Sequence, residues 1–344
     1  LMRRKNFKEN IFYDVSAWTL PLAYGVGQLG LKKSLDATQL EPAKIQWQRK
    51  VAAAELAGPE NTVSYLIDWR VDAAPKLLQR LLAAGANVRV AKQRFSSPTV
   101  SGGDRQFGYG TLSLAVGVQS GKLDRLLPIL QTGVERGAVV TAARSGLSIG
   151  GPDLGSSNFP VIEKPQVAML TGSGVSAYGA GEIWHLLDHQ INLPVTLLKQ
   201  SRLSRADLSE YTRLILPGGF LNDTDWQLVS DYVSDGGTVI AIGSAANDVA
   251  RKMNVLGSPN GMAPIEPGDK EAGRVESPIH GTVIINGQEV QKPFESAADE
   301  RALRLISGAI FNTRIDRTHP LMFGFSKDNL AVFRNHGSFL KPSD

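Results

Sequence analysis

The fold that the sequence predicts rests on one stretch, Val167-Ala168-Met169-Leu170-Thr171-Gly172-Ser173-Gly174-Val175-Ser176-Ala177. Its first four residues are apolar, a glycine-containing turn follows them, and residues 179–190 then show helical spacing. A short apolar run followed by a turn and a helix is typical of a βα unit. Because this pattern recurs along the chain, we expect an α/β protein with mainly parallel, doubly wound sheets.

Similar units lie on both sides of this stretch. Further strands are expected at residues 62–67, 87–91, 111–118 and 138–142, then at 195–198, 214–216 and 238–242. Further helices are expected at residues 72–84, 122–136, 223–234 and 245–253. Two late apolar runs, at residues 303–311 and 330–333, are expected to be strands that return to the sheet.

The distribution of Gly, Ser and Pro predicts how these units divide into domains. Residues 145–165 are rich in all three and form the best boundary or long loop in the chain. We therefore expect a first α/β unit at residues 61–160 and a second α/β domain at residues 161–344. Residues 1–60 include the aromatic run Phe12–Pro21, so they are expected to be an ordered segment packed on a domain.

Composition limits the kinds of function that are open to the chain. The 344 residues suffice for two globular domains, and the absence of cysteine excludes disulfides, thiolate metal sites and a cysteine nucleophile. The net charge of +4 comes from scattered basic residues, whereas nucleic-acid surfaces show clustered ones. No apolar run approaches the roughly 20 residues that a membrane helix needs. We expect neither a nucleic-acid partner nor a membrane span.

The first candidate site is the loop that contains Gly172, Ser173 and Gly174. Gly172 to Ala177 fit a Gly-x-Gly-x-x-Ala fingerprint, in which glycines let backbone amides approach a pyrophosphate. The next strand ends at Leu198-Lys199-Gln200, with no acidic residue to hold a ribose. A tight turn that needs glycine is therefore favoured. Nucleotide binding through Gly172 and Gly174 stays as an alternative.

Two further loops could present an oxyanion hole and a nucleophile. Gly218 and Gly219 follow a strand and could offer free amides to an anion or oxyanion. Ser244 lies in a strand-to-helix bend, but a Gly-x-Ser-x-Gly elbow would need glycine in place of Ile242 and Ala246. Ser244 is therefore favoured as a helix N-cap. No complete set of catalytic residues is present.

The histidines do not form an obvious metal site. His185 and His189 lie four residues apart on one helix, but the glutamate of zinc-peptidase helices is replaced by Leu186. The apolar residues beside them, Ile183, Trp184, Leu187 and Ile191, can form the buried side of the helix. Asp188 could be a third ligand of a metal, but the two histidines are favoured as the solvated face of the helix, and we expect no metal ligands in this chain. His319 lies in a loop with no evident partner.

Three features together resemble class I glutamine amidotransferase-like domains. These are Pro217-Gly218-Gly219 after one strand, the bend at Gly243-Ser244 after the next, and the distal pair His319-Pro320. The resemblance implies a flavodoxin-like fold for the C-terminal half. That family has a cysteine nucleophile in the bend and a glutamate where Leu321 stands, so the usual thiol reaction is excluded. An alternative is a serine-type hydrolase that uses Ser244 and His319 without an orienting carboxylate.

A second resemblance covers nearly all of the chain. Residues 12–21, 151–156 and 181–188 are similar to the C-terminal region of large bacterial zinc carboxypeptidase-like proteins. That family implies an exported parent whose peptidase domain binds zinc through a His-x-x-Glu motif and would lie upstream of Leu1. No His-x-x-Glu occurs here, so no zinc ligand and no cofactor is expected in this chain.

The preferred hypothesis for function follows from this second resemblance. We expect a non-catalytic accessory region that binds a ligand or the upstream peptidase domain. No residue is expected to be catalytic. The candidate binding residues are Gly172, Ser173, Gly174, Gly218, Gly219, Ser244 and His319.

Overall fold

A computed structural model describes residues 56–119, 121–219, 221–252, 256–257, 282–285, 288–291, 309–334 and 339–340. The described residues fall into two compact units. The larger unit draws on Gln46–Val249 and Ile315–Asp328, and the smaller one on Leu1–Ile45, Ala250–Arg314 and Asn329–Asp344. Most of the predicted N-terminal segment, residues 1–55, lies outside the described residues.

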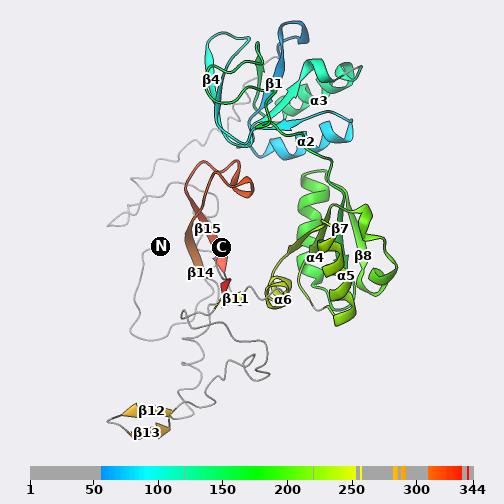
Figure 1. The fold of residues 1–344 in the computed structure, drawn as a ribbon, viewed down its shortest axis with the longest axis vertical. Coiled ribbons are helices and arrows are strands. Elements are labelled where there is room, and N and C mark those ends of the chain that lie inside the picture. The colour runs from blue at the N-terminus through cyan, green and yellow to red at the C-terminus, as the bar shows by residue number, and fades with distance from the viewer. Residues whose placement is uncertain are drawn as a thin grey trace, which may run out of the picture. The chain divides into compact units, whose positions relative to one another are not determined.

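The first sheet of the larger unit is antiparallel. Its strands are β1 (Ser64–Ile67), β2 (Arg89–Val90), β5 (Leu112–Ala115) and β6 (Val140–Ala143), in the order β2-β5-β1-β6 (Figure 1). Strand β1 runs antiparallel to both of its neighbours, β5 and β6. The prediction of a mainly parallel sheet is therefore wrong for this part of the chain.

The connections explain why this sheet is antiparallel although helices and strands alternate. Helix α2 (Ala73–Ala83) links β1 to β2, and α3 (Leu123–Glu135) links β5 to β6. In the sheet, β5 lies between β1 and β2, and β1 lies between β5 and β6. This is a split βαβ arrangement, in which two crossover units interleave head to tail. Short 3-10 helices lie at Pro59–Asn61 (η3) and Val116–Val118 (η4).

A hairpin that the sequence pattern did not reveal covers one face of this sheet. Strands β3 (Phe95–Pro98) and β4 (Asp104–Phe107) pair with each other between β2 and β5. Tyr65 and Ile67 pack with α2 and α3, whereas Leu66 points to the other face because side chains alternate along a strand. That second face is filled by a buried cluster of Leu66, Ala91, Phe95, Phe107, Ala143, Leu154 and Phe159.

The second sheet is parallel, as the sequence predicted. Its strands are β7 (Val167–Thr171), β8 (Val195–Lys199), β9 (Arg213–Leu216) and β10 (Thr238–Ala241), in the order β10-β9-β7-β8. All three neighbouring pairs run parallel. The chain moves from β7 to β8 on one side and then to β9 and β10 on the other. The strand order therefore reverses between β7 and β9.

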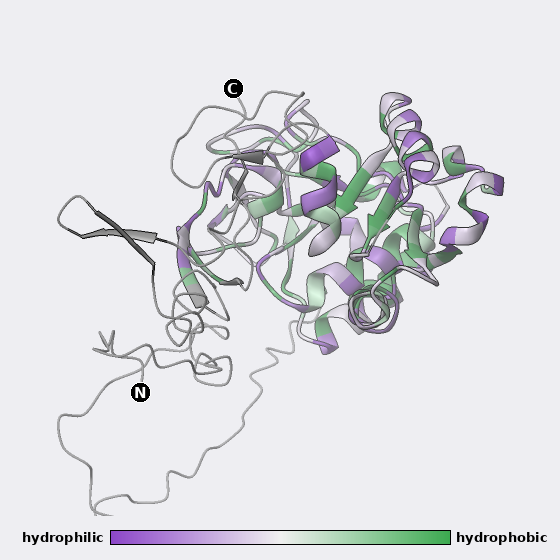
Figure 2. Cartoon of the chain, turned by 90° about the horizontal axis from the view of Figure 1, so that it is seen from below, coloured by the Kyte–Doolittle hydropathy of each residue, from purple (hydrophilic) through white to green (hydrophobic). Residues whose placement is uncertain are grey.

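Helices connect the strands of this second sheet. They are α4 (Ala177–Trp184), α5 (Asp223–Ser234), α6 (Ser244–Lys252), the π-helix η5 (His185–Gln190) and the 3-10 helices η6 (Gln200–Arg205) and η7 (Leu208–Glu210). Ala168, Leu214 and Leu216 pack with Trp226 and Val229 of α5. The side chains that alternate with these along the strands point to the other face of the sheet. There Val167, Met169 and Ile215 pack with Ala180 of α4. In Figure 2 several strands are green along much of their length, whereas the helices carry purple as well as green residues.

The late strands do not join either four-stranded sheet. Strand β14 (Ala309–Arg314) pairs antiparallel with β15 (Asn329–Arg334) in a sheet of their own. The prediction that they return to the main sheet is wrong, and its residues 303–308 lie outside the described part. The remaining strands form two other antiparallel pairs, β11 (Leu256–Gly257) with β16 (Phe339–Leu340) and β12 (Thr282–Ile285) with β13 (Gln288–Gln291). Within the described ranges, no helix has the length and apolar character of a membrane span.

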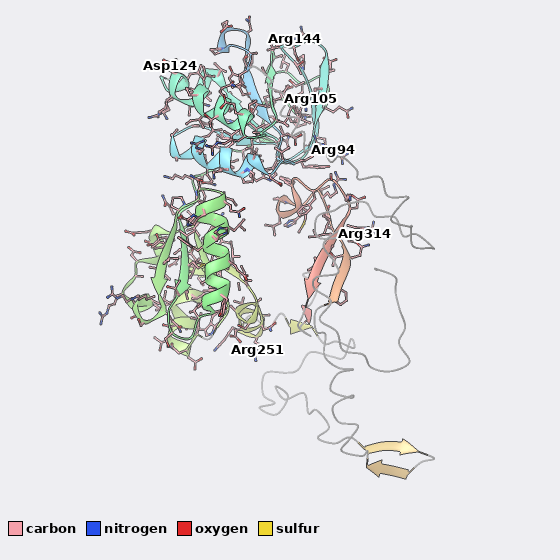
Figure 3. All side chains as sticks on the ribbon, turned by 180° about the vertical axis from the view of Figure 1, so that it is seen from behind. Arg94, Arg105, Asp124, Arg144, Arg251 and Arg314 are labelled. Atoms are coloured by element: carbon pink, nitrogen blue, oxygen red, sulfur yellow. The ribbon has the colours of Figure 1, made fainter. Side chains whose placement is uncertain are left out.

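Asp68 and Arg70 form an ion pair just after β1. Burial alone would raise the pKa of Asp68, but hydrogen bonds from the guanidinium and backbone of Arg70, and the charge of Arg105, lower it overall. Asp68 Oδ2 lies 2.6 Å from Arg70 Nη2. Figure 3 shows Arg105 on the face of the first sheet that carries the hairpin.

Replacing Asp68 by Asn should lower the stability of the protein at neutral pH. Because the folded pKa is below the unfolded value of about 3.9, the carboxylate stabilises the fold fully above that pH. Its contribution is lost as the pH falls through the folded pKa. We therefore expect the difference in free energy of unfolding between wild type and Asp68→Asn to shrink below pH ~4 in urea titrations. A difference that stays constant from neutral to strongly acidic pH would contradict this assignment.

Candidate functional site

The candidate site lies where the carboxyl ends of the parallel strands meet. In an open parallel sheet, ligands bind outside these ends, at the place where the strand order reverses. Here that place is between β7 and β9. We call the residues that follow β7, β9 and β10 at this edge, namely 172–176, 217–219 and 243–244, the carboxyl-edge site.

The loops after β7 and β9 are joined to each other by their backbones. Val175 and Gly219 form an antiparallel bridge, and the amide of Ser176 donates to the carbonyl of Gly218 over 3.2 Å. Gly219 has a φ of 113°, and an added Cβ would overlap the Gly174 carbonyl oxygen. The structure thus brings Gly174, Gly218 and Gly219 together.

Two serine hydroxyls lie beside Gly218 at this junction. A Cβ added to Gly218 would be 3.3 Å from Ser244 Oγ and 3.5 Å from Ser176 Cβ. Ser176 caps α4 by accepting a hydrogen bond from the Gly179 amide over 3.2 Å. Ser244 Oγ accepts from the Gly219 amide over 2.9 Å. Both hydroxyls accept in these bonds, so each keeps its own proton for donation.

Ser244 differs from the helix N-cap that the sequence predicted. It is the first residue of α6, and its hydroxyl bonds the loop after β9. This bond joins Ser244 to an amide that the sequence suggested as an oxyanion donor. The Gly219 amide therefore donates to the protein itself in this structure.

Gly243 has a left-handed backbone conformation in the turn between β10 and α6. Its φ is 62°, and an added Cβ would meet no atom within 4 Å. In a nucleophile elbow the reactive residue occupies the strained position of the turn. Among the described residues, Asn192 is the only non-glycine with positive φ, so Ser244 is not strained in this way. The residue with the left-handed backbone angle in this turn is thus a glycine with open space around it.

An elbow motif can also be centred on Gly243, one residue before Ser244. Centring the motif on Ser244 put Ile242 and Ala246 where glycines are needed. Centring it on Gly243 puts Ala241 and Ala245 there, and both are small. That pair of alanines is the signal that could have identified the bend.

His319 lies in the loop between β14 and β15, next to the short 3-10 helix η9 (Pro320–Met322). Its Nδ1 accepts from the Leu321 amide over 3.2 Å, and the side chain is exposed. Phe323 in the same loop stacks on Tyr109, which lies between β4 and β5, with ring centroids 5.8 Å apart. Where the structure is described, no hydrogen bond joins Ser244 to His319. Their pairing stays a prediction.

The remaining candidate residues, Gly172 and Ser173, are exposed at the tip of the loop after β7. Gly172 has a φ of 101°, and its nearest non-neighbouring backbone is at Lys199 and Gln200. Over the described ranges, no three His, Asp or Glu side chains come together as metal ligands. A cavity of about 540 Å³ lies at the opposite, amino edge of the sheet, around Asp207, Arg213 and Gly237. Its lining residues do not include the carboxyl-edge site.

Comparison of the chain with protein-family models, with curated proteins and with solved structures finds no match.

Proposed function

We propose that this chain is a non-catalytic binding region of an amidotransferase-like, flavodoxin-like α/β type, in an exported zinc carboxypeptidase-like protein. The observation that carries the proposal is Gly243 at the strained position of the bend. Acyl transfer through a covalent intermediate needs a nucleophilic side chain, and glycine has none. The carboxyl-edge site then holds a ligand or the neighbouring peptidase domain without breaking a bond.

The order of the parallel strands supports the flavodoxin-like assignment. Numbered along the second sheet from β7, the strands lie in the order 2-1-3-4. Flavodoxin-like sheets have the order 2-1-3-4-5 and bind their ligand where strands 1 and 3 diverge. The Pro217-Gly218-Gly219 loop and the bend at Gly243 follow strands 3 and 4, which is where the resemblance to amidotransferase-like domains puts them.

The hydrogen bonds at the site favour holding over cleaving. The Gly219 amide is bonded to Ser244 Oγ, so the suggested oxyanion donor and the suggested nucleophile are bonded to each other. The hydroxyl protons of Ser176 and Ser244 can still donate outward. A ligand or protein surface that presents acceptor oxygens, such as carbonyl or carboxylate groups, would suit them.

The first test asks whether Ser244 is reactive. We expect a fluorophosphonate probe to leave Ser244 unlabelled by mass spectrometry, and we expect the purified chain not to cleave peptides with or without added zinc. Labelling of Ser244 that is lost in Ser244→Ala would contradict the proposal and support the hydrolase alternative.

The cysteine-free chain allows a matched positive control. In Gly243→Cys, the single thiol would lie at the N-terminus of α6, where the helix dipole lowers a thiol pKa. We expect its alkylation by iodoacetamide at pH 7 to be several-fold faster than that of a thiol at Ser234, the last residue of α5. Equal rates would mean that the bend does not provide the environment of a nucleophile elbow.

A further inference from the structure

Three aromatic side chains meet where α4 continues into the π-helix η5. The rings of His185 and His189 face each other, with centroids 5.6 Å apart and an angle of 21° between their planes. The ring of Trp184 meets His189 edge to face at 4.6 Å. Sequence periodicity put Trp184 on the buried side of the helix, but its side chain is 37% exposed. It therefore lies beside the two imidazoles rather than in the core.

The π-helix is the local reason that these rings come together. Its wider turn is visible in the hydrogen bond from the Ile191 amide to the Leu186 carbonyl, five residues earlier, over 3.0 Å. Such turns are rare and occur often at functional positions. Ile183 and Leu187 on the inner side still pack against the second sheet, so the backbone that carries the histidines is fixed.

Although the sequence pattern predicted no metal ligands here, we propose that His185 and His189 form a two-imidazole chelate site for a divalent first-row transition ion, with water completing the coordination. Imidazole nitrogens bind such ions at about 2.0–2.1 Å, and a tetrahedral angle between two of them puts the ring centroids about 5 Å apart. The observed 5.6 Å is close to this separation, but the rings are stacked with 21° between their planes, so the two exposed side chains must rotate before their nitrogens converge on one ion. The affinity should follow the order Cu²⁺ over Ni²⁺ and Zn²⁺.

The composition of the chain makes this site unusually easy to assign. It has no cysteine and five histidines, so thiolates cannot compete for the ion. Trp184 supplies a reporter, because bound Cu²⁺ quenches a tryptophan that touches its ligand. The site does not depend on the proposed function of the carboxyl edge, which could fail without affecting it.

The test is a titration of the full chain with Cu²⁺ alone, followed by tryptophan fluorescence, and with Zn²⁺ alone, followed by calorimetry. We expect saturable binding of one ion per chain to this site. Removing a residue that only hydrogen-bonds a metal ligand typically weakens metal binding about tenfold or more, so removing a ligand itself should weaken binding at least as much. His185→Ala and His189→Ala should therefore each weaken binding by at least about tenfold.

Two variants test whether the ion binds this pair of imidazoles or simply any histidine of the chain. The double exchange His189→Gln with Gln190→His keeps the composition but moves one imidazole around the helix, so it should also lose binding. Gln190→Ala should bind like wild type, and Trp184→Phe should lose most of the fluorescence change while calorimetry still reports binding. Absence of saturable binding in wild type, or binding by His185→Ala and His189→Ala within threefold of wild type, would leave an adventitious ion only and overturn the proposal.

Discussion

Replacing Gly219 by alanine is expected to lower the free energy of unfolding by about 3–5 kcal/mol. Two costs add at this position. The φ of 113° is one that residues with a Cβ rarely adopt, and the new methyl group would overlap the Gly174 carbonyl and lie 2.7 Å from Val175 Cα. Both contacts are with backbone, which cannot rotate away as a side chain can. The bridge between the loops after β7 and β9 would have to open.

Gly172→Ala is the matched control for this prediction. Gly172 has a similar φ of 101°, but its nearest atom to an added Cβ is 3.9 Å away. Gly172→Ala should therefore cause backbone strain without steric overlap, and it should lower the free energy of unfolding by about 1–2 kcal/mol. Urea unfolding followed by circular dichroism measures both variants. Equal losses for Gly172→Ala and Gly219→Ala would show that the two loops are not in contact as described.

Phe159→Ala should destabilise the protein by about 3–5 kcal/mol, the usual cost of emptying a buried aromatic site. Phe159 is fully buried, and its ring meets Phe95 of the hairpin edge to face at 5.1 Å. It fills the second face of the first sheet together with Leu66 and Leu154. Removing the ring would leave a cavity between the sheet, the hairpin and the loop.

Ile149→Ala, in the same Gly-rich loop, serves as the control. Ile149 is 58% exposed, so its truncation should change the free energy of unfolding by no more than about 0.5 kcal/mol. Thermal or urea unfolding of both variants tests the comparison. A small effect of Phe159→Ala would mean that residues 145–160 are a simple linker, as their composition suggested, and not part of the core.

For the carboxyl-edge site, the sequence predicted the loops but not what they do to each other. Gly172, Gly174, Gly218 and Gly219 were identified because glycine after a strand indicates a turn with unusual backbone angles. The contact between Gly219 and Gly174 joins loops about 45 residues apart, and only packing of the sheet brings them together. The role of Gly243 likewise depends on a backbone angle that no residue pattern states.

Local sequence patterns were enough to predict the strands and the parallel direction of the second sheet. Buried parallel strands are continuous apolar runs, and β7 and the last three residues of β9 follow this rule, whereas β10 at the edge of the sheet is only partly buried. Local propensity and burial agree at these residues, so the pattern suffices. The exposed ends of the helices were also close to their predicted places, because caps such as Asn222 act within a few residues.

The strand pairing of the first sheet, in contrast, depends on contacts between distant parts of the chain. Its strands and helices alternate as in a parallel sheet, but β1 pairs with β5 and β6 in the antiparallel sense. Strand direction is fixed by which distant strand supplies the hydrogen-bonding partner, and that choice is non-local. The one local sign of this antiparallel pairing was that the sequence predicts no helix between residues 91 and 111. The same holds for His185 and His189, whose separation depends on a π-turn that spacing cannot reveal.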